Sequence, residues 1–307
     1  MFAWSLKRLL SAIPTLLLLI TLAFFLMRVA PGGPFDYERS LPPEIEANLK
    51  AKYHLDEPVA KQYLRYLSQL ARGDLGPSFQ YQDYTVTELI LAGLPVSLLL
   101  GGLSVLLALA LGILAGSFAA LRRNRWPDHL VMSLAMTGIS IPNFVMAPLL
   151  ILLFAIVLKI LPAGGWNDAA PQNLVLPIIV LALPQVAYVA RITRSSLIEV
   201  LHSDFIRTAR AKGLSARAVL LRHALKPAMV PVASYVGPTA AAVMTGSVVV
   251  EQIFGIPGVG RFFVQGALNR DYTLVLGIVI FYGALVVLFN LFVDLAYAAL
   301  DPRVRYT

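Results

Sequence analysis

The residue types that carry most enzyme chemistry are few in this chain and lie far apart. Its four histidines, His54, His129, His202 and His223, are scattered, and no H-E-x-x-H pair is present to hold a metal ion. The sequence also lacks a G-x-x-x-x-G-K-S/T loop to cradle nucleotide phosphates, a G-x-S-x-G turn, and any cysteine. We therefore expect this chain to bind no metal, nucleotide or other cofactor itself.

An intramembrane hydrolase remains a remote alternative. An aspartyl protease of that kind needs two facing aspartates within membrane spans, and only Asp294 lies near one. Asp294 is close to the inner end of the last apolar run, where a structural partner such as an inner-side arginine is the expected role. Asn143 and Asn290 lie inside apolar runs, where hydrogen bonding between helices is the simpler interpretation.

One stretch, 203–227, is the longest basic segment and carries clear helix signals. Ser203 is a favourable N-cap, and Gly213 supplies the left-handed residue that ends a helix. Ser215 can cap a second helix, which Pro227 limits. The first helix, about ten residues and roughly 15 Å long, is too short and too charged to span a membrane. We expect it to lie on the membrane surface.

The first predicted helix has an apolar side and a basic side. Its apolar side consists of Phe205, Ile206 and Ala209. Its positive charges lie around the rest, at Arg207, Arg210 and Lys212. A plain cytoplasmic loop, held inside by its positive charge, is the alternative interpretation of such a segment.

The rest of the chain is typical of an integral membrane protein. Of its 307 residues, 58% are hydrophobic and only 14% charged, with a mean hydropathy of +0.74. The net charge of +8 comes from basic residues in short loops between apolar runs, which argues against nucleic acid as a partner. We expect one helical membrane bundle rather than two soluble domains.

Six apolar runs are long enough to span a membrane: 9–27, 94–121, 130–158, 174–190, 227–250 and 274–293. We expect the first to be an anchor rather than a cleaved signal peptide. The fourth contains Pro177, Pro184 and Gln185, so it should be buried in the bundle, where neighbouring helices satisfy the freed carbonyls. Glycines at 112 and 116 give a weak signal for close helix approach.

Charge asymmetry predicts the orientation. Basic residues collect in the segments that lie on the same side of the membrane as the two chain ends, and such segments are normally cytoplasmic. Both termini should therefore be cytoplasmic. The predicted parts are a start and first span (1–30), an extracytoplasmic segment (31–93), and a five-span core (94–307). The core carries a cytoplasmic loop at about 191–226.

The extracytoplasmic segment should contain short helices. Pro43 opens one with the pair Glu46 and Lys50, and Pro58 opens another. The second has an apolar stripe that we expect to pack onto the membrane domain rather than to contact a ligand: Val59, Tyr63, Tyr66, Leu67 and Leu70. Thr85 and Glu88 form a capping box that starts the helix leading into the second span.

A second candidate site follows the fifth span on the outer side, at 251–260. Its glycines and proline cannot continue a helix, so we expect a short hairpin or half-helix that dips back toward the bilayer. The residues singled out in this re-entrant loop are Glu251, Phe254, Gly255, Pro257, Gly258 and Gly260.

The basic stretch, DFIRTARAKGLS at 204–215, resembles the cytoplasmic loop of bacterial ABC-importer permeases of the peptide/nickel group. That superfamily carries a Glu-Ala-Ala signature with a Gly four residues after the second Ala. Gly213 matches the Gly and Ala209 the second Ala. Arg207 and Thr208 replace the Glu and the first Ala, as in the peptide branch.

Further stretches along the chain resemble the first membrane subunit of oligopeptide permeases. They are APGGPF, LPPE, AKYHLDEP, GDLGPSF, LAMTGISIPNF, RITRSSLIEVLHSDFIRTARAKGLS, RHALKPA, IFGIPGVG, ALNRDY and LDPRVRY. The resemblance implies a six-span type I ABC importer permease, all-α, in the bacterial inner membrane. It also implies a second permease subunit as heterodimer partner, two ATPase subunits that hold ATP and Mg, and an extracytoplasmic peptide-binding protein.

The resemblance further implies a role for the basic helix. It would couple transport to ATP hydrolysis by docking on one ATPase, through Asp204, Phe205, Ile206, Arg207, Thr208, Ala209, Arg210, Ala211, Lys212, Gly213, Leu214 and Ser215. The expected cargo is oligopeptides. Dipeptides, glutathione, nickel chelates and antimicrobial peptides are alternatives for the same machinery, and a structural scaffold is a further alternative from another class.

Overall fold

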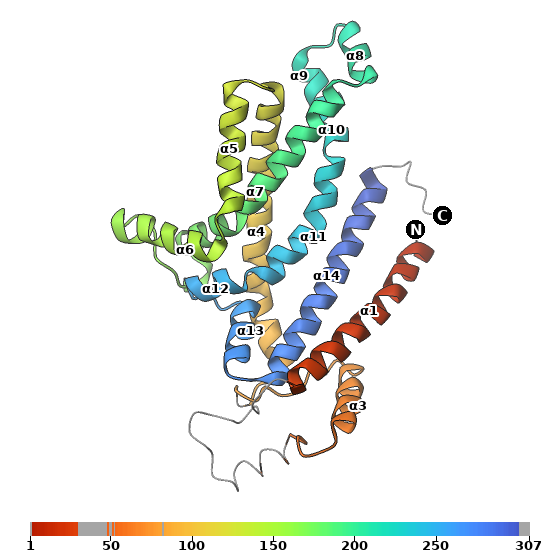
Figure 1. Cartoon of the computed structure of the whole chain (residues 1–307), viewed down its shortest axis with the longest axis vertical. Coiled ribbons are helices and arrows are strands. Elements are labelled where there is room, and N and C mark those ends of the chain that lie inside the picture. The colour runs from red at the N-terminus through yellow and green to blue at the C-terminus, as the bar shows by residue number, and fades with distance from the viewer. Residues whose placement is uncertain (1, 30–47, 49–50, 52, 82, 301–307) are drawn as a thin grey trace. The chain divides into compact units, whose positions relative to one another are not determined.

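The computed structural model describes residues 2–29, 48, 51, 53–81 and 83–300, without the side chains of 2–9, 245, 246 and 293–300. The expected helix with Glu46 and Lys50 lies outside the described residues. The described elements are α1 Phe2–Val29, α3 Val59–Leu70, α4 Val86–Leu121, α5 Trp126–Ser140, α6 Asn143–Leu150, η1 Ile151–Val157, η2 Asn167–Ala169, α7 Pro171–Leu201, α8 Asp204–Ala211, α9 Ala216–Ala218, η3 Val219–Ala224, α10 Leu225–Ala228, α11 Val230–Gly246, α12 Val248–Phe254, α13 Val259–Leu268 and α14 Tyr272–Leu300 (Figure 1).

The helices confirm an all-α membrane fold. Four are long and apolar enough to cross a membrane: Leu10–Val29 in α1, all of α4, all of α7, and Tyr272–Phe292 in α14. Two further candidates are bent pairs, one joining α5 to α6 and η1, the other joining Ala216–Ala228 to α11. If each bent pair is one span, the described chain holds six, as the sequence predicts.

The sequence shows the third predicted span, 130–158, as one uninterrupted apolar run, but the structure breaks it into two helical parts. Its two halves meet at an angle of 104°. Ile141 adopts an extended conformation (φ −98°, ψ 116°), and Pro142 takes the N-cap position of α6. Proline lacks the N–H that would continue the helix and disfavours helical backbone in the residue before it. The break therefore follows from a proline inside an otherwise apolar run.

Helix α7 is the most buried of the four straight spans. The sequence predicts 174–190, and the helix extends beyond both ends of that range. Of its most apolar window 56% is buried, against 28% for α4 and 33% for α14. Both Pro177 and Pro184 lie inside it. The expectation that this proline-containing span is buried is confirmed.

The chain divides into two compact units by its internal packing. One comprises Ser97–Ile256 and the chain from Val286 onward, and the other comprises Phe2–Val96 and Pro257–Leu285. Helices α4 and α14 each contribute to both units. The segment 257–285 therefore packs with the N-terminal part of the chain, although the sequence groups it with the core. The domain boundaries drawn from the sequence remain a prediction.

In the second unit, α3 packs on the membrane helices α1 and α14. Tyr66 is 6% exposed in a cluster with Phe24 of α1 and Leu276 of α14. Three more stripe residues pack against the same cluster, Tyr63, Leu67 and Leu70. The predicted role of the stripe in packing is confirmed for these residues, while Val59 is 42% exposed.

Asp271, to which the sequence analysis gave no structural role, holds the loop that precedes α4. Its fully buried carboxylate accepts hydrogen bonds from the Ser78 hydroxyl and from the backbone N–H groups of Phe79, Gln80 and Leu274. Several hydrogen bonds to one carboxylate, of which the bond from Ser78 is short, hold this irregular loop in place.

The capping box at the start of α4 forms as predicted. The Thr85 N–H and hydroxyl both donate to Glu88 Oε2 at 2.8 Å, and the Glu88 N–H donates back to Thr85 Oγ1 at 3.2 Å. This reciprocal pair satisfies backbone donors that the first turn of a helix leaves without partners.

Candidate functional site

The short basic helix predicted from the sequence is α8. Ser203 takes the N-cap position with extended backbone, but its hydroxyl donates to the Val200 carbonyl at 2.6 Å instead of capping α8. Asp204 occupies the first turn, where negative charge is favourable. The following helix is capped as predicted, because Ser215 Oγ accepts a hydrogen bond from the Ala218 N–H at 3.3 Å. Pro227 does not end that helix, which continues to Ala228.

A Schellman turn ends α8. Gly213 has φ +78°, the left-handed conformation that the sequence predicts for it. Its N–H donates to the Arg210 carbonyl at 2.9 Å, and the Leu214 N–H donates to the Ala209 carbonyl at 3.4 Å. A Cβ atom at Gly213 would meet no atom within 4 Å. The glycine is therefore required by backbone conformation and not by a lack of space.

The two faces of α8 differ from the expected arrangement. Ile206 and Ala209 are buried at 0% and 6% exposure, within a cluster of this chain's own residues. Phe205, which the sequence groups with them, is 50% exposed. The expectation that Ala209 faces a partner is therefore not met, because a helix of eight residues must bury one face to be held in place. The outward apolar residues are Phe205 and Leu214.

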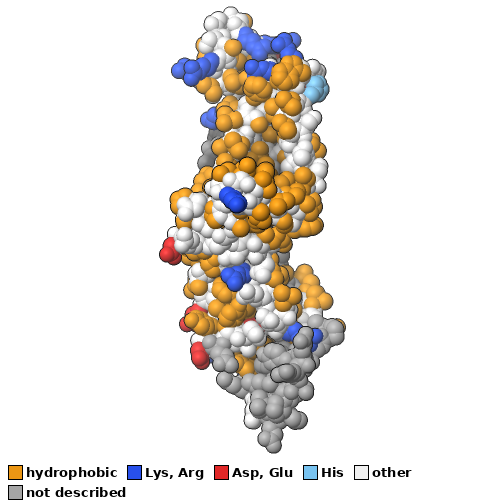
Figure 2. Space-filling view, turned by 90° about the vertical axis from the view of Figure 1, so that its left-hand side faces the viewer, with side chains coloured by type: hydrophobic (Ala, Val, Ile, Leu, Met, Phe, Trp, Pro, Cys, Tyr) orange, Lys and Arg blue, Asp and Glu red, His pale blue; other side chains and the backbone are white. Residues whose placement is uncertain are grey.

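The seat beneath α8 is built from helices that the sequence does not show to be neighbours. Its buried residues come from α4, α7 and the helix 216–228: Ala120, Leu197, Val219, Ala224 and Ala228. Exposed cations surround α8 and the turn after it, at Arg207, Arg210, Lys212, Arg217 and Arg222. Figure 2 shows Lys and Arg side chains gathered at the end that carries α8 and α9. This end presents an apolar and basic surface on a packed base.

An ion pair with a buried carboxylate joins α7, one of the helices beneath α8, to α5. Arg194 of α7 donates to Asp128 of α5, with Nε 2.6 Å from Oδ1 and Nη2 2.6 Å from Oδ2. Asp128 is fully buried and also accepts the Asn124 N–H at 2.9 Å. Sequence reasoning counted both charges toward orientation and missed the pair. The signal available was an acid, Asp128, that closely follows three arginines of the same inner loop, Arg122, Arg123 and Arg125.

Close packing of α4 on α7 confirms the weak glycine signal. A Cβ at Gly116 would lie 2.7 Å from Thr193 Cβ and 3.1 Å from the Ala190 carbonyl carbon. A Cβ at Gly112 would lie 2.6 Å from Val189 Cβ. Neither distance is compatible with a real side chain unless the helices move apart, so both glycines set the distance between α4 and α7.

The second candidate site, 251–260, is a turn between two helices. Residues 251–254 belong to α12, which ends at Gly255 (φ +65°). The Ile256 N–H donates to the Glu251 carbonyl at 2.9 Å, which completes a second Schellman turn. The Gly165 N–H donates to the Phe254 carbonyl at 2.7 Å and so ties the loop before α7 to this turn.

The glycines of this segment have different roles, and one expectation about them needs correction. Gly260 does not break a helix, since it is the second residue of α13. Gly258 has φ −92° and needs no left-handed backbone, but a Cβ on the neighbouring Gly93 would lie 2.9 Å from its carbonyl carbon. Close backbone approach is therefore the constraint at Gly258, and positive φ is the constraint at Gly255.

Glu251 is fully buried on α12, although the sequence places it in an outer loop. Its Oε1 accepts a hydrogen bond from the Ser97 hydroxyl at 2.8 Å and another from the Ser247 hydroxyl. An ionisable group at such depth marks a functional position by default. Among the described residues, no group of three or more His, Cys, Asp or Glu side chains is placed to hold a metal ion.

Comparison with known proteins gives a consistent result. Residues 112–306 match the family model described as the inner membrane component of binding-protein-dependent transport systems. The chain is 57% identical over its full length to the oligopeptide transport system permease protein OppB of Escherichia coli K12, and covers all of that protein. It is 44% identical to the dipeptide transport system permease protein DppB of Bacillus subtilis, over 99% of this chain and 98% of the relative.

Two solved structures share the fold. One is a chain of the MetNI methionine ABC transporter in an inward-facing conformation, with a TM-score of 0.57 at 18% identity. The match covers 70% of this chain and 97% of that one. The other, an amino acid ABC transporter, gives a TM-score of 0.50 at 21% identity over 69% of this chain and 94% of that one. These matches support the same membrane helix arrangement.

Proposed function

Because the chain belongs to the family of inner membrane components of binding-protein-dependent transport systems, we propose that it is the permease subunit of an ATP-driven importer for oligopeptides. The similarity to an oligopeptide permease over the whole length supports this cargo over the dipeptide alternative, whose relatives are less similar. Its place would be the cell membrane, with both termini in the cytoplasm.

The observation that carries the coupling role is the construction of α8. Its inner face, Ile206 and Ala209, is buried in this chain. Its outer face presents Phe205 at 50% exposure beside exposed arginines. A well-exposed aromatic side chain on a fixed base is suited to fill a pocket on a partner, because buried aromatic side chains dominate interface energies. We propose that this partner is an ATPase subunit with acidic groups around an apolar groove.

The chemistry of ATP would belong to partner subunits. This sequence has no phosphate-binding loop, so ATP and Mg would be held by two ATPase subunits, and this chain would be a non-enzymatic transport subunit. A second permease subunit and an extracytoplasmic peptide-binding protein would complete the complex. Peptide would cross between the two permeases as their bundles move.

The segment 251–260 is the proposed outer gating element. It combines a fixed left-handed turn at Gly255, a buried carboxylate at Glu251, and a link from the Phe254 carbonyl to the loop before α7. It also contains the junction of the two compact units, between Ile256 and Pro257.

The test is reconstitution of the whole complex. The tagged chain should co-purify with two ATPase subunits and a second permease. In proteoliposomes, a pentapeptide presented with the binding protein should stimulate ATP hydrolysis and accumulate inside. Isolation of the chain without ATPase partners, or peptide-independent hydrolysis by the chain alone, would contradict the proposal. A stronger response to a dipeptide than to a pentapeptide would reassign the cargo.

A further inference from the structure

Helices α7 and α11 lie side by side (Figure 1). A connected group of four polar and aromatic side chains joins them. The Tyr235 hydroxyl of α11 donates to Gln185 Oε1 of α7 at 2.7 Å. The rings of Tyr235 and Tyr188 lie 5.5 Å apart between their centres, and the Arg191 guanidinium lies 5.1 Å from the centre of the Tyr188 ring. Each side chain thus holds the next, and the group ends at the charge of Arg191.

The surface of these two helices lacks the large apolar side chains that other spans expose. Helix α4 exposes such side chains along its length, from Leu91 to Leu121. Among the described side chains, α7 exposes only Val175 of this kind and α11 exposes none. The exposed positions of α11 are occupied by smaller or polar residues: Pro231, Ser234, Pro238 and Ala242. Because lipid tails cannot satisfy polar groups, a surface of this kind in a membrane borders other protein or a water-filled space.

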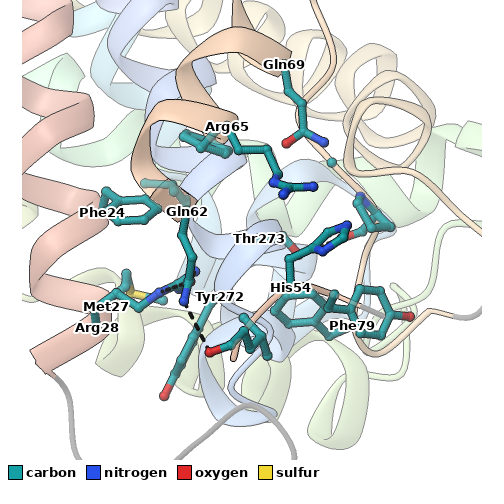
Figure 3. Close-up of a pocket in the computed structure, with 16 residues that line it drawn as sticks. Phe24, Met27, Arg28, His54, Gln62, Arg65, Gln69, Phe79, Tyr272 and Thr273 are labelled. Carbon is teal, nitrogen blue, oxygen red and sulfur yellow. Dashed lines mark hydrogen bonds between the residues drawn. The ribbon is translucent and has the colours of Figure 1, made fainter. Parts of the chain in front are cut away.

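Arg191 is exposed on α7, and no carboxylate of the described part of the chain lies within ion-pair distance of it. Its neighbour on the same helix, Arg194, is paired with Asp128. The arginine at the end of α1, Arg28, is held by two hydrogen bonds to Gln62 (Figure 3). Arg191 instead rests on the Tyr188 ring, which positions the guanidinium and leaves its N–H donors without a partner among the described residues.

An exposed cation near the end of a span has a simpler explanation in the positive-inside effect. That effect requires only a charge, however, and an unsupported arginine in any rotamer would supply it. Here the guanidinium of Arg191 is stacked on Tyr188, and Tyr188 is backed by Tyr235. The Tyr235 hydroxyl is fixed in turn by Gln185. Three side chains from two helices therefore hold one cation in a defined position, which is the arrangement expected of a ligand-binding group.

The chemistry that all peptides share identifies the ligand. Every peptide with a free C-terminus carries one carboxylate, whatever its side chains are. Such a charge is costly to move through a narrow passage of low dielectric, and arginine offsets that cost because its guanidinium matches a carboxylate with two parallel hydrogen bonds. We propose that Arg191, positioned by Tyr188 and Tyr235, binds the C-terminal carboxylate of a peptide that passes along the α7–α11 surface. This role rests on the proposed function, since the transporter must carry peptides for Arg191 to meet one.

The test is uptake by proteoliposomes that contain the complete transporter, with a pentapeptide delivered by the binding protein either as the free acid or as its C-terminal amide. Uptake by each variant is divided by wild-type uptake of the same peptide, so differences in delivery by the binding protein cancel. Arg191→Gln should lower uptake of the free acid about tenfold, the loss expected for a hydrogen bond to a charged group, and should lower uptake of the amide by no more than about twofold. Tyr188→Leu should produce the same selective loss by releasing the guanidinium, while Tyr188→Phe, which keeps the ring, should not.

The matched control is Arg122→Gln. Arg122 is an exposed arginine that lies 3.9 Å from the centre of the Phe118 ring of α4, outside the α7–α11 surface, so its loss should leave the ratio of acid to amide uptake unchanged. Equal losses for the acid and the amide in Arg191→Gln, or no loss at all, would overturn the proposal. So would loss of the second permease from the purified Arg191→Gln complex, which would assign the surface to contact between the two permeases. Failure of the wild-type complex to take up either peptide would overturn the proposed function as well.

Discussion

Arg194 of α7 joins Asp128 of α5 through two hydrogen bonds of 2.6 Å, and the carboxylate is fully buried. The two residues are 66 positions apart in the sequence, and their pairing sets one end of α5 against α7. The base of α8 includes Leu197, one helical turn beyond Arg194. The pair is thus part of the frame that carries the proposed coupling surface.

Breaking this pair should destabilise the protein strongly. Arg194→Gln leaves a buried carboxylate without its charge partner, which typically costs about 3–5 kcal/mol. We expect a clearly lower melting temperature of the detergent-purified complex in a thermal shift assay. The control is Asp204→Ala, which removes an exposed pair with Arg207 and a favourable first-turn charge, and should lower the melting temperature far less. Equal melting of the two variants would contradict a structural role for the buried pair.

The glycine contact between α4 and α7 gives a matched pair of substitutions. Gly116→Ala should destabilise by about 1–3 kcal/mol, because its Cβ would overlap Thr193 and the Ala190 backbone. Gly102→Ala on the same helix should be neutral or stabilising, since its Cβ would meet only Met244 Cε at 3.8 Å and alanine favours helix. The measurement is the melting temperature of each variant. A lower melting temperature for Gly102→Ala than for Gly116→Ala would contradict the close packing of α4 on α7.

The outward face of α8 should carry binding to the ATPase. Phe205→Ala should weaken retention of the ATPase subunits about tenfold, as expected for loss of an aromatic contact at an interface centre. The melting temperature of the permease should not change, since Phe205 is half-exposed. Leu130→Ala removes a side chain of similar exposure in α5 and serves as the control. Pull-down of tagged complexes measures retention.

Two further changes in α8 separate docking from folding of the helix itself. Ala209→Glu would place a charge in the buried cluster and so disturb the seat of α8 rather than the contact face. Gly213→Val should strain the left-handed turn by about 1–2 kcal/mol, while Gly213→Asn should be tolerated. If Phe205→Ala and Gly213→Val both keep full coupling in proteoliposomes, α8 is a cytoplasmic connector only.

The outer turn should be sensitive at Gly255. Gly255→Val forces a β-branched residue into φ +65° and should lower peptide uptake while the complex still assembles. Gly255→Asn should retain most uptake, because Asn accepts left-handed backbone. Uptake per assembled complex is the measurement. Normal uptake by the valine variant would remove the reason to treat 251–260 as more than a connector.

The orientation in the membrane is testable because the natural chain contains no cysteine. A cysteine at Ser215 should react with a membrane-impermeant maleimide only after the cells are opened. A cysteine at Asn48 should react in intact spheroplasts. The reverse pattern would overturn the predicted cytoplasmic position of both termini.

Several local signals in the sequence predicted structure that depends on neighbours along the chain, although the Ser203 hydroxyl does not cap α8. The turn at Gly213, the cap at Ser215 and the box at Thr85 and Glu88 all form, because each rests on backbone geometry within a few residues. The apolar runs determined a helical membrane protein for the same reason, since hydrophobic length is a property of a contiguous segment.

Tertiary structure alone decided which face each element buries and which distant residues meet. Ala209 turned inward and Phe205 outward, because α8 packs on helices that periodicity does not identify as neighbours. The Asp128–Arg194 pair and the hydrogen bonds from Arg28 of α1 to Gln62 of α3 exist only once separate helices come together. A single sequence records how each segment prefers to fold, whereas contacts between segments depend on the packing of side chains from several helices at once.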